Sequence, residues 1–430
     1  MDIQGVHNYK RQIIIIGFFF FIFGFITWVN GALIPYLRIA CELEEWMTYL
    51  VTFAFYISYT IMAFPSGRLI NKTGMITAMR LGLIVMAFGC LLFIPAALTR
   101  TYAIFLVGLF VVGIGLTLLQ TALNPYITIL GPVNSAAQRI SMMGIFNKTA
   151  GMLAPLLLGA IIFKDADEFM KELAVLSAAE KTIKLDILAR AVILPYCLIA
   201  LLLILVAYAL KYAHLPEINP ESETGNGRLS DIKKAPGSSM NLVMGFIAIF
   251  CAVGVEVIAG DTIGNYGLYH ELSFDFSKGL TSYTLAAMMA GYILGVIVIP
   301  KFITQERAYL YCSIAGIAVT ILIIIIPGRS SVFFVALLGA VNALMWPAIW
   351  PTALQGLKGR SLNRGSSILI MGIAGGAIMP LLYGWMAEIS DNQTAYWVLL
   401  PCYFFSICYC IRSILQTRKR NKLNVSLYSE

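Results

Sequence analysis

Two acidic residues fall inside one long apolar run in the second half of the chain. Glu256 lies near the middle of residues 242–268, and Asp261 lies closer to one end. A charged carboxylate at the centre of a bilayer costs at least ~2.5 to 3.5 kcal/mol on insertion scales, so Glu256 should be neutral, paired or facing water. Both acids are therefore candidates for binding a proton or a metal cation, although Asp261 could also simply be hydrated at the mouth of a cavity.

Two amides stand one helical turn apart in an earlier apolar run. Gln120 and Asn124 are separated by four residues, which places them on one face of a helix, and Pro125 follows directly. Amides in hydrocarbon need hydrogen-bond partners, and the paired donors and acceptors of a sugar would supply them. The alternative is that they bond to neighbouring helices, as polar side chains in membrane bundles often do.

A third polar stripe carries two tryptophans. Asn342, Trp346 and Trp350 follow one another at intervals of four residues, between and beside two prolines. An aromatic face beside an amide suits the apolar face of a sugar ring. Tryptophan is also a common anchor at the membrane surface. The position of this pair well inside an apolar run favours a binding site.

The elements that hold these residues must be membrane helices. The chain of 430 residues is 59% hydrophobic and only 12% charged, against roughly a quarter charged in a soluble domain. Twelve apolar runs approach or reach the roughly 20 residues that cross a bilayer as a helix. They are residues 13–37, 46–69, 75–98, 102–130, 142–163, 187–212, 242–268, 280–300, 308–327, 332–354, 366–386 and 395–415.

The distribution of charge predicts the topology. With both termini in the cytoplasm, 21 of the 30 Lys and Arg residues, Lys148 among them, are assigned to the cytoplasmic side. The net charge of +8 therefore reflects membrane orientation and not nucleic-acid binding. The eight cysteines are scattered and only three histidines are present, so we expect no structural metal and no cofactor.

The only long polar stretch on the cytoplasmic side divides the chain into two halves. Residues 213–240 are rich in Pro, Gly, Ser and charged residues and are predicted to be a linker between residues 1–212 and 241–430. Another charged segment, residues 164–190, is predicted to form an amphipathic helix on the outer surface.

The two halves also resemble each other. The sequence AGMLAPLLLG at residues 150–159 matches GGAIMPLLYG at residues 375–384, and Pro125 corresponds to Pro351 at almost the same offset. This pattern predicts a parallel repeat of six helices, unless Gly and Pro recur by chance. The fold class is therefore an all-α membrane protein of two six-helix bundles.

The loop after the second span carries a glycine and basic motif. It reads Gly67-Arg68-Leu-Ile-Asn71-Lys72-Thr-Gly74, and it resembles the signature of the major facilitator superfamily between its second and third helices, with Asn71 in place of the usual acid. Gly67, Arg68, Lys72 and Gly74 are the predicted gating residues, because glycines allow helix ends to approach and cations can pair with helix C-termini.

Taken together, the motifs resemble the fucose permease branch of this superfamily, in particular its bacterial glucose/galactose transporters. The resemblance covers nearly the whole chain. It rests on NGALIP at residues 30–35, QTALNPYITILGP at residues 120–132, Ile145-Phe-Asn147, and residues 342–351 with Gly356-Leu357. It implies proton-coupled hexose uptake across the bacterial inner membrane by alternating access, and it adds Asn30 and Asn147 to the predicted sugar site.

Two departures from the branch concern the coupling. Gly31 and Gln120 stand where fucose permeases have an aspartate and a glutamate. Coupling to protons or sodium could have moved to Glu256 or Asp261, or the chain could be an uncoupled sugar facilitator.

Other classes of function are less consistent with the sequence. No intramembrane cluster of His, Asp and Ser predicts an enzyme, and the linker is too short for the signalling domain of a sugar sensor. Paired prolines in the two halves favour rocking bundles over a channel. The expected partners are a sugar and membrane lipid, and the expected state is a monomer.

Overall fold

The computed structural model describes residues 3–129, 136–162, 166–212, 238–299, 302–355, 357 and 360–427. Every regular element in these ranges is a helix. The first half contains α1 (Ile3–Trp28), α2 (Asn30–Ala40), α3 (Glu45–Thr48), α4 (Leu50–Thr73), α5 (Met75–Leu91), α6 (Phe93–Thr99), α7 (Tyr102–Ile129), α8 (Ala136–Ile162), α9 (Ala166–Val175), α10 (Ala178–Arg190), α11 (Ile193–Ala209) and η2 (Leu210–Tyr212).

The second half repeats this series of helices. It contains α12 (Ser238–Asp261), α13 (Ile263–Tyr269), α14 (Phe274–Ser277), α15 (Leu280–Val298), α16 (Gln305–Ile325), α17 (Ser330–Asn342), α18 (Met345–Ala353), α19 (Arg360–Met371), η4 (Gly372–Ala374), α20 (Gly375–Ile389), η5 (Thr394–Val398) and α21 (Leu399–Leu427).

Twelve stretches of the described chain are helical, long and apolar enough to cross a membrane. They coincide with the twelve runs predicted from the sequence, which confirms the all-α membrane fold. Six precede residue 213 and six follow residue 237. The predicted linker, residues 213–240, lies outside the described residues except for its last three.

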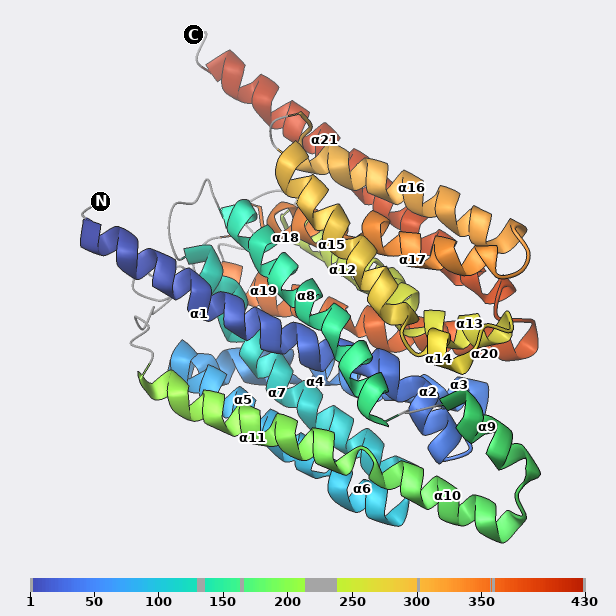
Figure 1. The fold of residues 1–430 in the computed structure, drawn as a ribbon. Helices are drawn as coiled ribbons and strands as arrows, with labels where there is room; N and C mark the ends of the chain where they lie inside the picture. Colours follow the sequence, from blue (N-terminus) through green and yellow to red (C-terminus); the bar gives the residue numbers. More distant parts are fainter. Residues whose placement is uncertain are drawn as a thin grey trace.

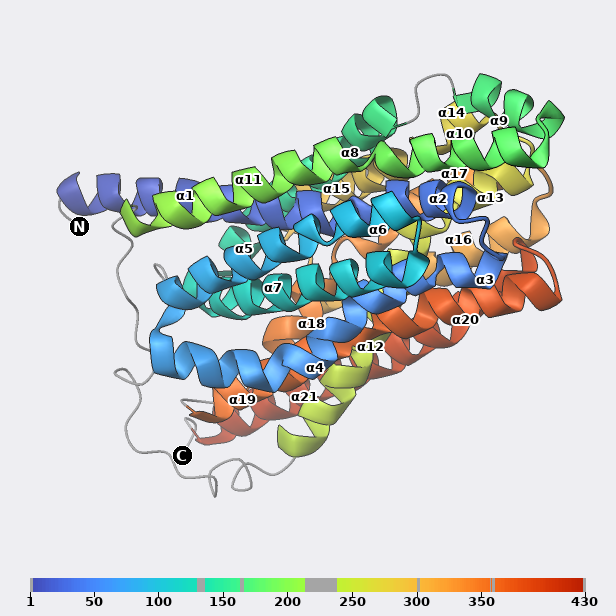
Figure 2. The same ribbon diagram turned by 90° about the horizontal axis from the view of Figure 1, so that it is seen from below.

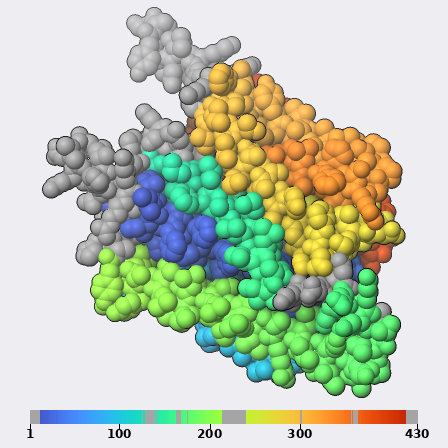
Figure 3. Space-filling view, in the orientation of Figure 1, coloured from blue at the N-terminus to red at the C-terminus, as the bar shows by residue number. Residues whose placement is uncertain are grey.

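The helices of the two halves pack in the same order (Figure 1). In the first half α1 packs on α8, and α7 lies between α4 and α5; in the second half α12 packs on α20, and α17 lies between α15 and α16. The halves meet where α8 packs on α15 and where α4 packs on α20. Figure 3 shows the α8–α15 seam, with the first half in blue to green and the second in yellow to orange. Each half thus contributes two helices to a shared interface.

Both ends of the chain lie at one end of the bundle (Figures 1 and 2). We call this the terminal end, and we call the opposite end, where α9, α10 and α13 lie, the loop end. The shared position of the termini agrees with an even number of spans.

Three spans are locally irregular in mid-course. The first span changes from α1 to α2 at Val29, and the seventh, its counterpart in the second half, changes from α12 to α13 at Thr262. Both residues keep helical dihedrals, and i→i−4 hydrogen bonds cross both positions, so neither span is unwound there. The tenth span divides at Ala343 and Leu344, between α17 and α18.

The charged outer segment forms two helices in place of the single helix predicted. α9 and α10 are separated at Ser177, which caps α10 together with Glu180 in a reciprocal capping box. Tyr36 of α2 donates hydrogen bonds to the carbonyls of Leu188 and Ala189, at 3.0 and 2.9 Å. These bonds hold α10 against the first half.

Candidate functional site

A cavity lies between the two halves, midway along the bundle. It encloses about 800 Å³ of space between protein atoms, including the part open to solvent. From Trp28 and Glu256 its wall continues towards the terminal end along Phe20 and Ile140. The lining residues are Phe20, Phe23, Thr27, Trp28, Tyr56, Tyr59, Gln120, Asn124, Ile140, Gly144, Asn147, Lys148, Val253, Glu256, Val257, Tyr292, Trp346, Pro347 and Ile373.

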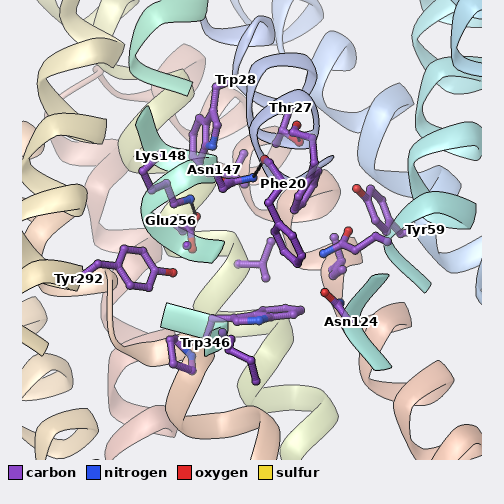
Figure 4. A pocket seen from close by; sticks show the side chains of 18 of the residues that line it. Phe20, Thr27, Trp28, Tyr59, Asn124, Asn147, Lys148, Glu256, Tyr292 and Trp346 are labelled. Carbon is purple, nitrogen blue, oxygen red and sulfur yellow. Dashed lines mark hydrogen bonds and ion pairs between the residues drawn. The ribbon is translucent and has the colours of Figure 1, made fainter. Parts of the chain in front are cut away.

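Five residues that the sequence predicts for the site line this cavity. Gln120 and Asn124 come from α7, Asn147 from α8, Glu256 from α12 and Trp346 from α18. Figure 4 shows Trp346 on one side of the cavity, Trp28 on the opposite side, and Asn124 away from both. The cavity therefore combines an aromatic surface with amides, as the sequence predicts.

Two buried polar atoms of residues that line the cavity lack a hydrogen-bond partner among the described residues. They are the amide oxygen of Gln120 and the indole nitrogen of Trp28, one acceptor and one donor. A buried polar atom without a partner is costly, so a conformation that exposed these atoms to a hydroxylated ligand would be favoured by the new hydrogen bonds.

Three residues predicted for sugar binding lie outside the cavity wall. Asn342 is buried, donates to the carbonyl of Val255 at 3.2 Å and accepts from the hydroxyl of Tyr403 at 2.7 Å. Its amide therefore links α17 to α12 and α21. Hydrogen bonding between helices was the alternative to sugar binding considered above for amides in the membrane. Trp350 stacks on Trp346 with ring centroids 5.3 Å apart. It therefore supports the cavity wall from behind.

Asn30 is the third of these residues. It begins α2, is fully buried, and neither atom of its amide has a hydrogen-bond partner among the described residues. It lies two residues after Trp28, about 200° further around the helix, whereas Thr27 and Trp28 face the cavity. The structure therefore separates Asn30 from the other amides.

The sequence analysis assigned Lys148 to the cytoplasmic side, and this assignment is wrong. Lys148 lies in the middle of α8 and is only 5% exposed. Its Nζ is 2.5 Å from Oε1 of Glu256 and 4.5 Å from the centre of the Trp28 ring. The sequence did contain evidence for the buried position of Lys148, because this lysine falls inside the apolar run 142–163. An acid inside the membrane, such as Glu256, also needs a cation as its partner.

Trp28 is held between the two halves. A Cβ atom at Gly151 of α8 or at Gly260 of α12 would overlap its ring, so both helices approach the indole through a glycine. The ring in turn lies beneath the ammonium of Lys148. The position of this cation therefore depends on two glycines that the sequence analysis did not connect to it.

Replacing Gly260 with alanine should displace Trp28 and lower the melting temperature of the purified protein. Overpacking of this kind typically costs about 1–3 kcal/mol. Gly159→Ala is the matched control, because a Cβ there meets only the flexible chain of Lys278 at 3.6 Å. Equal melting temperatures for both variants would show that Trp28 is not confined as described.

Asp261 lies outside the cavity and is not hydrated at a mouth. It is 3% exposed, and its Oδ2 accepts a hydrogen bond of 3.0 Å from Thr52 of α4. Since Thr52 belongs to the first half and Asp261 to the second, this bond joins the halves on the loop-end side of Glu256.

Further contacts close the loop end. Asn265 of α13 donates to Oε1 of Glu45 at 3.4 Å, and the rings of Tyr49 and Tyr383 meet edge to face at 5.8 Å. Burial raises the pKa of Glu45, while the nearby Arg38 acts in the opposite direction. The halves are thus in contact from Asp261 to the level of Glu45 and Asn265. Beyond these residues a hollow opens towards the loop end, between α2, α9 and α10 of the first half and α13 and α14 of the second.

The predicted gating motif ends α4 and starts α5 at the terminal end. Gly74 has a φ of 83°, which suits glycine at this turn, and Gly67 faces Ser367 of α19. Arg68 and Lys72 are exposed, and neither forms an ion pair with any residue that the structure describes. The motif is therefore at the seam between the halves, without the charge pair of the usual signature.

The family profile described as Major Facilitator Superfamily matches residues 14–374. The chain belongs to this superfamily. Over 411 residues it is 34% identical to the glucose/galactose transporter of Brucella abortus (strain 2308), with 94% of both chains covered. Over 396 residues it is 26% identical to the L-fucose-proton symporter of Escherichia coli (strain K12), covering 91% of this chain and 90% of the relative.

Solved structures of the superfamily share the fold. FucP in the outward conformation superposes with a TM-score of 0.75 at 22% identity, covering 94% of this chain and 99% of that one. The D-xylose-proton symporter gives a TM-score of 0.64 at 15% identity, covering 94% and 96%. The chain is thus a multi-pass membrane protein with the fold of this superfamily, and its curated relatives are sugar transporters.

Proposed function

We propose that this chain imports a hexose of the glucose or galactose type across the bacterial inner membrane by alternating access. Both termini lie in the cytoplasm in this proposal, so the loop end faces outward and is closed in this conformation. The cavity supports the proposal most directly, because it presents amides and a tryptophan to the same space between two related halves. The glucose/galactose transporters among the relatives support the substrate class.

The sugar would lie against the face of Trp346. Its hydroxyls would bond to Gln120, Asn124 and Asn147, which line the same cavity. Lys148 and Glu256 would add a charged donor and a charged acceptor, and hydrogen bonds to charged groups are stronger than those between neutral groups.

Coupling to a cation is the second part of the proposal. Glu256 faces the cavity, and Asp261 lies between the halves at the closed loop end, so both can sense the change of conformation. An uncoupled facilitator is the competing proposal. The ion pair between Lys148 and Glu256 favours it, because the acid already has a cation.

Counterflow of labelled glucose in proteoliposomes tests the proposed transport. We expect protein-dependent exchange that unlabelled glucose and galactose inhibit. Exchange no faster than in liposomes without protein would contradict hexose transport.

Imposed gradients separate the two proposals on coupling. A symporter should accumulate glucose when a proton or sodium gradient is applied. A facilitator should only equilibrate it, whichever gradient is present.

A further inference from the structure

The ion pair in the cavity joins the two halves of the molecule. Lys148 comes from α8 of the first half and Glu256 from α12 of the second, and their side chains are only 6% and 16% exposed. Figure 4 shows the two side chains pointing toward each other between Trp28 and Trp346. Any rocking of the halves about this cavity must move one partner relative to the other.

The surroundings of Glu256 leave Lys148 as its partner. Lys148 is the only lysine or arginine among the residues that line the described cavity, and Glu256 is the only acid. The other titratable groups that face the carboxylate are the hydroxyls of Tyr56 from α4 and Tyr292 from α15. Asp261, five residues further along α12, is bonded to Thr52.

The ammonium is also held independently of the carboxylate. Its Nζ lies 4.5 Å from the centre of the Trp28 ring, close enough for a cation–π interaction. Trp28 in turn is confined by Gly151 and Gly260. The protein therefore builds a place for a positive charge directly beside Glu256.

We propose that the Lys148 ammonium is a tethered cation that occupies the position an inorganic cation would take at Glu256. Glu256 then does not bind sodium, because a second positive charge would be repelled by the ammonium within a few ångströms. The sugar site is complete without sodium. This inference rests on the proposed transport function, and it narrows that proposal to sodium-independent transport.

Thermal unfolding of the purified full-length protein tests the inference without any sugar. Melting temperatures are compared in equal concentrations of NaCl and choline chloride at about pH 8, where a normal carboxyl group is ionised. The wild type should melt at the same temperature in both salts. Lys148→Met leaves a buried acid unpaired and should lower the melting temperature by about 5–10 °C in choline chloride.

Without the lysine, the stability of Lys148→Met should depend on a cation from the solution. Sodium, or a proton supplied by lowering the pH to about 6, should restore part of the stability of Lys148→Met. The double variant Lys148→Met/Glu256→Gln has no charge left to compensate. It should be more stable than the single variant and insensitive to sodium.

Lys278→Met is the matched control. Lys278 forms an ion pair with Asp275 at 2.6 Å, but this pair is more exposed and lies within one half. Its loss should change the melting temperature little and should not create a response to sodium.

Three results would overturn the inference. One is a sodium-specific stabilisation of the wild type that Glu256→Gln removes. Another is a Lys148→Met variant as stable as the wild type in choline chloride. The third is a double variant no more stable than the single one, which would assign Lys148 a packing role.

If the single variant does not fold, recovery of a folded protein by the double variant supports the charge pairing, and failure of both rejects it. Because no sugar is present, these outcomes are independent of the counterflow experiment, which alone decides whether the chain carries hexoses.

Discussion

Replacing Gln120 and Trp346 together with alanine should abolish glucose counterflow while the protein remains folded. The two side chains lie in different halves and line the same cavity. Loss of an aromatic face and of a hydrogen-bonding amide costs roughly 3 kcal/mol together, or about a hundredfold in affinity. The measurement is counterflow of labelled glucose at a sugar concentration that half-saturates the wild type.

The matched control replaces a polar residue and a tryptophan that do not line the cavity. Thr121 is buried and donates to the carbonyl of Thr117, and Trp385 of α20 is 59% exposed on the outside of the bundle. Thr121→Ala/Trp385→Ala also removes one polar side chain and one tryptophan, and it should retain counterflow within a few-fold of the wild type. If counterflow survives in the first variant, or is lost equally in both, the assignment of the sugar site to this cavity is wrong.

The sequence predicted the spans well because burial in lipid demands long apolar runs. It also predicted Gln120 and Asn124 on one face of α7, since this helix is continuous through both residues. The prediction that Asn342, Trp346 and Trp350 share one helix face, which rested on their four-residue spacing, was wrong in the tenth span. A break at Ala343 and Leu344 separates α17 from α18, so Asn342 bonds to Tyr403 while Trp346 faces the cavity.

Trp28 and Asn30 in the first span face different directions for a simpler reason. They are two residues apart, which is about 200° around a helix, and Val29 between them keeps helical dihedrals. Trp28 lines the cavity and Asn30 is buried elsewhere, and no pattern in the sequence indicates which of the two faces points to the site. That choice depends on packing against other helices, which a single span does not encode.

Lys148 was missed for a different reason. The topology was predicted from the excess of Lys and Arg in cytoplasmic loops, and Lys148 was counted with the nearest such loop. This rule takes no account of whether a lysine has an acidic partner inside the membrane. Glu256 was correctly expected to need a partner or water, but Lys148 is 108 positions away in the chain and no sequence pattern pairs the two. Only the packing of α8 near α12 brings them together.

Replacing Gly384 with leucine should slow the transport cycle and leave the sugar site intact. A side chain at this position of α20 would overlap the ring of Tyr49, which belongs to the other half, at the closed loop end. The clash should cost the closed conformation about 1–3 kcal/mol and slow counterflow about tenfold or more. Stabilisation of the purified protein by glucose should persist, because Gly384 is remote from the cavity lining.

Two further variants show whether the effect arises from closure of the loop end. Gly159 corresponds to Gly384 in the sequence repeat, but its neighbour is the flexible chain of Lys278, so Gly159→Leu should transport nearly as well as the wild type. Adding Tyr49→Ala to Gly384→Leu makes room for the leucine and should restore counterflow. Normal transport by Gly384→Leu alone would mean that the contact with Tyr49 does not control access. Failure of the Tyr49 substitution to rescue it would point to damage within the second half, and not to a gate between the halves.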